Sequence, residues 1–391
     1  MSIVSIVKCE DYDERKLDMV ISKVFDDLGG IEKFVKPGMK VAIKPNLVSA
    51  KNPEDGATTH PALVGAVARL LVKNGASVML AESPGGLYTK LLLKRVYASC
   101  GMEKIAQKEG ILLNYDISEV EVENPEGQLL KRVSIIKPLL DADLVINLPK
   151  LKTHGQMVYT GAVKNMFGAV PGELKAEYHF RMTNYTNFAN ALIDIFLAVK
   201  PQLSIMDAVV GMDGAGPTAG NPFKIGLVLG SENAFELDYA AIKIIGADPL
   251  KIPIIYQAVK RGLCPETESQ ISITGEKLKD IRVEGFDIPA LQSMKSILFY
   301  ENSIFNFFAN KLKASPQLNK KVCTGCTNCI KVCPAKVIVL KNGKPEIDLR
   351  MCIRCFCCQE LCPVKAISLK KPFVMRLMSK RRKFYRHKKD F

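Results

Sequence analysis

Residues 323–363 read CTGCTNCIKVCPAKVIVLKNGKPEIDLRMCIRCFCCQELCP. This stretch contains the pattern Cys-x2-Cys-x2-Cys-x3-Cys-Pro twice, and the second copy begins 29 residues after the first. Nine of the twelve cysteines of the 391-residue chain lie here. In a reducing compartment, such crowding of thiols indicates soft metal ligands rather than disulfides.

The spacing of the cysteines predicts two [4Fe–4S] clusters. Three thiolates of each cluster come from one tight loop, and the fourth Cys of each motif ligates the other cluster in proteins with this pattern. One predicted set is Cys323, Cys326, Cys329 and Cys362, and the other is Cys352, Cys355, Cys358 and Cys333. Structural zinc is the alternative, but zinc takes four ligands and eight cysteines repeat here. Cys357 has no place in either set and is expected to be an inert, packed thiol.

Residues 319–371 resemble bacterial-type two-cluster ferredoxins. The resemblance implies a small α+β domain that transfers single electrons to or from a redox partner protein such as a ferredoxin, a flavodoxin or a reductase. Neither half can hold its cluster without the other, so folding and cluster assembly are expected to be one event. Between the halves, Asn342-Gly343 predicts a hairpin turn.

The first ~295 residues alternate short apolar runs with helical patterns, which is typical of an α/β domain with a mainly parallel sheet and flanking helices. Predicted strands cover residues 41–43, 77–82, 144–147, 203–206 and 225–229, and predicted helices begin at Pro61 and near Phe235. In such sheets, ligands bind beyond the carboxyl ends of the strands. Polar side chains follow most of these strands, so a site is expected at that edge.

Several segments resemble the prokaryotic family catalogued as domain of unknown function 362, over about residues 1–290. They are residues 44–48, 57–61, 147–154, 160–172 and 207–217. The resemblance implies a fold but no reaction. Thr153-His154 and residues 161–172 are also similar to the N-terminal domain of nickel-pincer lactate racemases.

The leading hypothesis is an iron–sulfur oxidoreductase whose α/β domain binds an anionic substrate, because lysines and imidazoles suit carboxylates and phosphates. The predicted catalytic residues are His154, Lys164, His60 and His179, and the predicted binding residues are Lys44, Asn46, Lys152, Asn165, Asp207 and Asp213. Lys150 accompanies them. His154 is the first candidate for proton transfer, since imidazole titrates near neutral pH. Residues 161–165 are expected to present backbone amides to an anion.

Two alternatives accompany this hypothesis. The chain could be a non-catalytic electron carrier or assembly subunit whose α/β domain binds a protein partner. Each histidine or lysine could also be a structural residue. A role for the clusters in nucleic-acid processing is disfavoured: of the net charge of +15, residues 370–391 hold +9, which leaves +6 for the other 369 residues.

The expected boundaries are an α/β domain at 1–295, an aromatic-rich linker helix at 296–318, a ferredoxin-type domain at 319–371 and a basic tail at 372–391. Weak contact of the linker and tail with an anionic membrane surface is a further possibility. The N-terminus lacks the shape of a secretory signal, and no apolar run approaches the ~20 residues of a membrane span. We therefore expect a cytoplasmic protein, and anaerobic metabolism as its setting.

Overall fold

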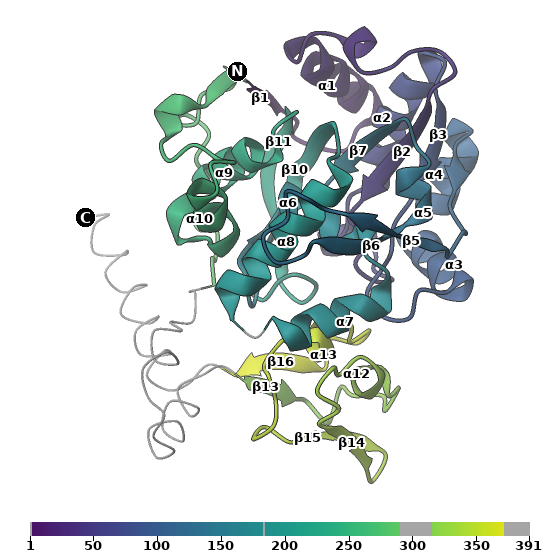
Figure 1. Cartoon of the computed structure of the whole chain (residues 1–391), viewed down its shortest axis with the longest axis vertical. Coiled ribbons are helices and arrows are strands. Elements are labelled where there is room, and N and C mark those ends of the chain that lie inside the picture. The colour runs from purple at the N-terminus through teal and green to yellow at the C-terminus, as the bar shows by residue number, and fades with distance from the viewer. Residues whose placement is uncertain (1, 183, 290–314, 371–391) are drawn as a thin grey trace. The chain divides into compact units, whose positions relative to one another are not determined.

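The computed structural model describes residues 2–182, 184–289 and 315–370 (Figure 1). The chain divides into two compact units, Met1–Pro289 and Ala290–Phe391, called here the α/β unit and the cluster unit. Most of the predicted linker helix, and the basic tail, lie outside the described residues. Among the described residues, no helix is long and apolar enough to cross a membrane.

A ten-stranded sheet forms the centre of the α/β unit, with the order β12-β1-β11-β10-β7-β2-β3-β4 and with β8 and β9 attached beside β10. Its strands are β1 (Ile3–Lys8), β2 (Lys40–Pro45), β3 (Ser77–Leu80), β4 (Leu112–Leu113), β7 (Leu144–Leu148), β8 (Lys150–His154), β9 (Val158–Thr160), β10 (Leu203–Asp213), β11 (Asn221–Ser231) and β12 (Ser272–Gly275). The strands β4, β3, β2, β7 and β10 run parallel, while β11 is antiparallel to both β10 and β1. The predicted mainly parallel sheet is thus confirmed.

Helices flank this sheet (Figure 1). They are α1 (Glu14–Asp27), α2 (Pro61–Lys73), α3 (Lys90–Ser99), α4 (Met102–Glu109), α5 (Lys137–Leu140), α6 (Ala162–Asn165), α7 (Gly172–Arg181), α8 (Tyr185–Val199), α9 (Ala234–Ile244) and α10 (Pro253–Lys260). A separate hairpin pairs β5 (Glu119–Glu123) with β6 (Arg132–Ile136). Helix α2 begins at Pro61 as predicted, because proline fits the first helical position and the His60 side chain caps the Ala62 amide.

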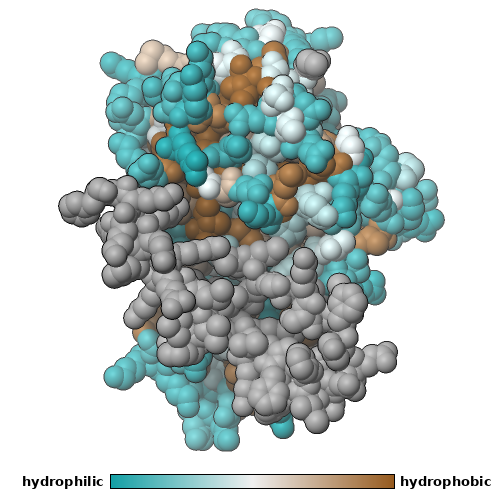
Figure 2. Space-filling view, turned by 90° about the vertical axis from the view of Figure 1, so that its left-hand side faces the viewer, coloured by the Kyte–Doolittle hydropathy of each residue, from teal (hydrophilic) through white to brown (hydrophobic). Residues whose placement is uncertain are grey.

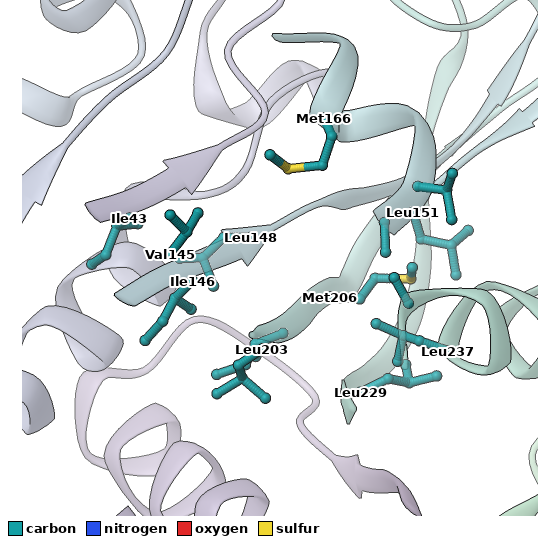
Figure 3. Close-up of a cluster of buried hydrophobic side chains, with 14 of the residues drawn as sticks. Ile43, Val145, Ile146, Leu148, Leu151, Met166, Leu203, Met206, Leu229 and Leu237 are labelled. Atoms are coloured by element: carbon teal, nitrogen blue, oxygen red, sulfur yellow. The ribbon is translucent and has the colours of Figure 1, made fainter. Parts of the chain in front are cut away.

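Apolar side chains from the central strands pack together beneath these helices (Figure 3). Ile43, Ile146 and Leu203 come from the neighbouring strands β2, β7 and β10, and all are fully buried. Met166 and Leu237, from the segments after β9 and β11, also belong to this buried cluster, and Leu237 lies beside Leu229 (Figure 3). Hydrophobic residues still reach the surface in separate patches between hydrophilic ones, as on the face in Figure 2.

Two strands differ from the prediction. Residues 150–154, which were expected only to follow the predicted strand 144–147, themselves form β8, and every residue of β8 is buried. Asp207, expected at a strand end, lies inside the eleven-residue β10. The reason is that β10 pairs first with β7 at Leu203 and Ser204 and then with β8, where Asp207 lies opposite Lys150. A polar run can be a buried strand because each polar group finds a partner there.

The described part of the cluster unit, residues 315–370, contains two small sheets and two short helices. Antiparallel pairs join β13 (Ser315–Leu318) to β16 (Ile367–Lys370) and β14 (Ile338–Lys341) to β15 (Lys344–Ile347), and the helices are α12 (Asn328–Lys331) and α13 (Cys357–Glu360). The predicted turn at Asn342-Gly343 is confirmed, with φ of 51° and 71°. Residues 315–318, assigned to the linker from the sequence, instead form β13 of this unit.

The duplication in the sequence is also a duplication of the backbone. Left-handed φ values recur 29 residues apart at three pairs of positions: Gly325 and Arg354, Thr327 and Phe356, Lys336 and Lys365. Five of these six residues carry a Cβ that disfavours a positive φ, so the surrounding loops impose the conformation. The two cysteine loops therefore have the same shape despite different side chains.

Candidate functional site

Two cavities in the cluster unit are each lined by four cysteines. The first has an empty volume of about 310 Å³ and is lined by Cys323, Cys326, Cys329 and Cys362. The second has an empty volume of about 320 Å³ and is lined by Cys333, Cys352, Cys355 and Cys358. Each cavity brings together one of the ligand sets predicted from the spacing, including the fourth cysteine from the opposite motif.

The donor chemistry of both cavities fits an iron–sulfur cubane. Four thiolates surround one space, and thiolates are the ligands of [4Fe–4S] clusters. A zinc site would place four sulfurs about 2.3 Å from one ion. In the described parts of the chain, no group of three or more His, Cys, Asp or Glu side chains is arranged to hold a single metal ion. Cys357 is buried and lines neither cavity, as expected for a packed thiol.

In the α/β unit, four side chains form what we call the His60 cluster: Tyr12, His60, Lys150 and Asp207. The Lys150 ammonium donates to Asp207 Oδ2 at 2.8 Å and to the Tyr12 hydroxyl at 2.9 Å. Tyr12 in turn donates to Asp207 Oδ1 at 2.9 Å, and the His60 backbone amide donates to Oδ2 at 2.9 Å. The rings of Tyr12 and His60 stack with centroids 3.6 Å apart.

Burial and the ion pair set the electrostatics of this cluster. Burial lowers the pKa of Lys150, and the Asp207 carboxylate opposes that shift. Burial also lowers the pKa of His60, with Asp207 opposing and Lys150 reinforcing the change. Because His60 Nδ1 accepts from the Ala62 amide, the ring proton of neutral His60 sits on Nε2, 3.7 Å from the exposed carboxylate of Glu54. His60 is therefore an imidazole that joins a buried ion pair to the surface.

A second group of polar residues lies at the carboxyl ends of β2 and β7. The Lys44 ammonium is fully buried and donates to Glu82 Oε2 at 3.0 Å and to the Pro45 carbonyl at 2.8 Å. Burial lowers the pKa of Lys44, and Glu82 opposes the shift. Gly168 packs directly over this pair, since a Cβ there would lie 2.2 Å from Glu82 Oε1. Lys44 and Glu82 thus neutralise one another in a tightly packed setting.

Three asparagines extend this group as a chain of amide hydrogen bonds. Asn46 Oδ1 accepts from the Lys152 ammonium at 2.7 Å, and Asn46 Nδ2 donates to Asn165 Oδ1 at 2.8 Å. Asn165 Nδ2 donates to Asn147 Oδ1 at 2.7 Å and to the Lys44 carbonyl at 3.2 Å. Lys152 also donates to the Ala57 carbonyl. The predicted residues Lys44, Asn46, Lys152 and Asn165 are therefore brought together, and all their charges and amides have partners within the protein.

The backbone amides at residues 161–165 already hold an anion from the chain itself. Asp238, on α9, accepts from the Ala162 and Val163 amides at 2.6 and 3.0 Å and from the Tyr159 hydroxyl at 3.0 Å. Gly161 permits this approach, because a Cβ would lie 2.1 Å from Asp238 Oδ1. Burial raises the pKa of Asp238 to about 6. Sequence reasoning missed Asp238, because α9 also contains Glu236 and Lys243 and nothing in the helix distinguishes this acid.

The remaining predicted histidines lie in structural surroundings. His154 is fully buried on β8, and its Nδ1 accepts from the Gln156 and Met157 amides at 3.1 Å each, which organises a tight turn. His179, on α7, packs against Phe167 and Phe188 with ring centroids 5.7 and 4.5 Å away. Their roles in catalysis stay predictions.

The other two predicted residues are separate from the His60 cluster. Asp213 accepts from the Asp287 amide at 3.0 Å and from Asn221 Nδ2 at 3.3 Å, so it fastens the segment after β12 to the end of β10. The Lys164 ammonium lies 5.7 Å from the centre of the Phe167 ring and is only partly buried. Lys164 is thus the one lysine of the predicted set that solvent reaches.

Comparisons with known proteins agree with this division of the chain. The family described as Domain of unknown function (DUF362) matches residues 41–243, and the 4Fe-4S dicluster domain family matches residues 315–363. The thylakoid-associated protein sll1697 of Synechocystis sp. (strain ATCC 27184 / PCC 6803 / Kazusa) is 32% identical over 294 residues, which cover 73% of this chain and 87% of that protein.

A solved structure, the lactate racemase apoprotein from Thermoanaerobacterium thermosaccharolyticum, is similar with a TM-score of 0.40 and 12% identity. The match covers 62% of this chain and 57% of that one.

Proposed function

This chain belongs to the family described as domain of unknown function 362 and carries a 4Fe–4S ferredoxin-type domain at residues 315–363, and we propose that it is an iron–sulfur oxidoreductase. Two [4Fe–4S] clusters would pass single electrons between a redox partner and a site on the α/β unit. The observation that carries the proposal is the presence of two cavities, each lined by four cysteines drawn from both motifs.

The ligands that we propose follow these linings. Cys323, Cys326, Cys329 and Cys362 would hold the first cluster, and Cys333, Cys352, Cys355 and Cys358 the second. When bound, each cluster supplies a one-electron donor and acceptor. The short helices α12 and α13 each position one cysteine of the loop, Cys329 and Cys358, toward its cavity. Interlocked ligation explains why both motifs must be present for either site to form.

For the site on the α/β unit, we propose the His60 cluster as the place where protons move. His60 is only partly buried and is fixed by the Tyr12 ring and the backbone of α2, and imidazole is a common proton donor and acceptor in proteins. Lys150 and Asp207 hold compensating charges behind it. His154 keeps its place as a candidate, but its complete burial and its role in a turn make His60 the stronger one.

The non-catalytic alternative has one specific observation in its favour. The lysines Lys44, Lys150 and Lys152, which were expected to attract an anionic substrate, all donate to partners within the α/β unit. An α/β unit whose cations are satisfied internally would suit an electron carrier or assembly subunit that binds a protein partner. A cytoplasmic location also stays a proposal.

The first experiment tests cluster content and ligand assignment together. Anaerobically purified protein should contain about eight irons with equal sulfide and show EPR signals of reduced [4Fe–4S] centres after reduction. Cys326→Ser/Cys362→Ser should then lose about half of the iron, because both cysteines line one cavity. Cys326→Ser/Cys333→Ser should lose nearly all of it, because the two residues serve different cavities. Cys357→Ala is the matched control and should keep full iron content.

Zinc in place of iron, or equal iron loss in the two double variants, would contradict the assignment. The α/β unit is tested separately with an anaerobic screen of small anionic metabolites against the whole protein. His60→Gln should abolish turnover of any substrate found while both EPR signals remain. Absence of any bound metabolite would favour the carrier alternative.

A further inference from the structure

The net positive charge of the sequence lies in residues 315–391, with +7 in residues 315–370 around the two cysteine motifs and +8 in residues 371–391. Residues 315–370 hold ten Lys or Arg and three acids, whereas residues 1–314 hold 36 of each sign. A surface with one predominant sign attracts partners of the opposite sign and speeds their association. The cluster unit is therefore the part of the molecule that an acidic protein would approach.

The two cysteine loops differ in how they cover their cavities. The first reads CTGCTNC and the second CIRCFCC, so small polar residues at 324, 325 and 327 correspond to Ile353, Arg354 and Phe356. The outcome is visible at the middle cysteine of each loop: Cys326 is exposed, whereas Cys355 is 8% exposed. Phe356, which is 5% exposed, is part of the lining of the second cavity. At the middle cysteine of its loop, the first cavity is thus open to solvent. At the corresponding position, the second cavity is covered by apolar side chains.

Lysines surround the open loop. Lys320 and Lys321 precede it and are exposed, and Val322 between them and the first cysteine is 45% exposed. The tip of the β14–β15 hairpin packs against the same loop, since a Cβ on Gly325 would lie 2.7 Å from the Gly343 carbonyl. Lys344 on that tip donates to the Cys323 carbonyl.

We call the four lysines around this loop the basic rim: Lys320, Lys321, Lys341 and Lys344. Within the rim, the Lys341 ammonium lies 3.4 Å from the Glu346 carboxylate. Protein interfaces commonly have an apolar centre surrounded by polar and charged residues. Val322, with the lysines around it, has this composition on a small scale. The rim therefore has the charge and the position of a docking surface beside the first cavity.

We propose that the site formed by Cys323, Cys326, Cys329 and Cys362 is the port through which electrons enter or leave the protein, and that the basic rim docks an acidic redox protein there. This inference rests on the proposed function, because it requires a cluster at that site. In each encounter the reduced partner, a one-electron donor such as an acidic flavoprotein, is oxidised by one electron and the first site is reduced by one. The reverse holds for an electron acceptor, and no atom is transferred.

The second site is the inner one in this arrangement. Electron tunnelling weakens steeply with distance, so the site with the exposed cysteine exchanges electrons with an outside partner faster than the site beneath Ile353 and Phe356. Burial in apolar surroundings also disfavours the more negative, reduced state of the second site.

The test measures electron transfer from photoreduced flavodoxin, an acidic flavoprotein probe, to the intact protein by anaerobic stopped-flow absorbance. Lys320→Glu/Lys321→Glu should lower the second-order rate constant about tenfold at low ionic strength, and the difference should shrink at ~1 M salt, where the Debye length falls to ~3 Å. Lys320→Gln/Lys321→Gln should give a smaller decrease. The matched control is Lys277→Glu/Lys279→Glu, which makes the same charge change at two exposed lysines of the α/β unit and should leave the rate within twofold.

Iron content and EPR of every variant separate this inference from the proposed function. Protein without iron would refute the proposed function, whereas full clusters with equal rates in the rim and control variants would refute the port alone. A neutral deazaflavin photoreductant should reduce all variants equally. Vesicles of phosphatidylcholine with phosphatidylglycerol test the other use of a basic surface. If the rim variant lost vesicle binding but kept its flavodoxin rate, the rim would be a membrane contact and the proposal would fall.

Discussion

Lysines of the α/β unit and lysines of the cluster unit differ in what compensates their charge. Lys44 and Lys150 are buried and form ion pairs with Glu82 and Asp207 at 3.0 and 2.8 Å. Lys320 and Lys321 are exposed on the surface of the cluster unit. Lysine is thus part of the packed interior in the α/β unit and part of the charged surface in the cluster unit.

This contrast changes what a lysine in a motif implies. A buried lysine whose charge is already paired offers little attraction to an anion, because its field is cancelled within a few ångströms. An exposed lysine keeps its field, subject to screening by salt. The lysines that suggested a substrate site are therefore weaker candidates for binding than those that were counted only as part of the net charge.

The largest expected effect tests whether the buried pairs are structural. Asp207→Ala should lower the free energy of unfolding by about 3–5 kcal/mol, because it leaves the Lys150 ammonium buried without its counter-charge. Urea denaturation followed by circular dichroism under anaerobic conditions measures the change. Asp11→Ala is the matched control, since it removes the partner of a half-exposed pair, Lys16–Asp11, and should cost far less than Asp207→Ala.

Replacing both members of the pair sharpens this test. Lys150→Met/Asp207→Leu removes the unpaired charge and should recover part of the stability lost in Asp207→Ala. If the single variant were as stable as wild type, the Lys150 ammonium would have another compensating group and the contrast with the surface lysines would weaken.

A smaller effect is expected from the packing over the other pair. Gly168→Ala would place a Cβ 2.2 Å from Glu82 Oε1 and 2.6 Å from Lys44 Nζ, so we expect a loss of about 1–3 kcal/mol from overpacking. Gly65→Ala in α2 is the control, because its nearest contact would be an ordinary 3.4 Å and helix propensity favours alanine by up to about 1 kcal/mol. Opposite signs in the two variants would confirm that the Lys44–Glu82 pair is tightly enclosed.

Asp238 extends the comparison to a buried carboxyl group that forms no ion pair among the described residues. Its pKa is raised from 3.8 to about 6, so in the pH range between these values the folded protein binds a proton that the unfolded chain has released. Its contribution to stability therefore falls as the pH rises through this range. Between about pH 5 and pH 7, wild type should lose about 1 kcal/mol of stability relative to Asp238→Asn. Equal pH profiles of the two proteins in urea denaturation would show that Asp238 is ionised throughout.

The smallest effect is expected at the basic rim. Lys320→Gln/Lys321→Gln should change the free energy of unfolding by no more than about 0.5 kcal/mol, because both lysines are exposed. A loss as large as that of Asp207→Ala would mean that these lysines support the fold, and the contrast between the two units would fail.

Much of the fold could be predicted because its signals are local. The strands β2 and β7, the start of α2 at Pro61 and the turn at Asn342-Gly343 follow from short runs of neighbouring residues. The prediction was wrong at residues 150–154 and at Asp207, where β10 continues beyond the end of β7 and recruits β8 as a partner. Whether a run of polar residues is buried or faces solvent can be decided only when the residues that pair with it are known.

The candidate site shows the same division. The cysteine sets could be proposed from spacing, because the repeat specifies which four thiolates face one cluster. The partner of the amides at residues 162 and 163 is Asp238, 76 residues away from Ala162, and no local pattern connects them. The same holds for Lys150 and Asp207, which are 57 residues apart in the chain.

The amino-acid sequence by itself determined the two cysteine motifs, the alternation of strands and helices and the sign of the charge around the clusters. Only the tertiary structure decided which lysines are neutralised, which histidine reaches the surface and which cysteine loop is open. The physical reason is that ligand spacing and hydrophobic periodicity act between near neighbours in the chain. The free energy of a charge, in contrast, depends on its burial and on partners that the sheet topology brings from distant segments.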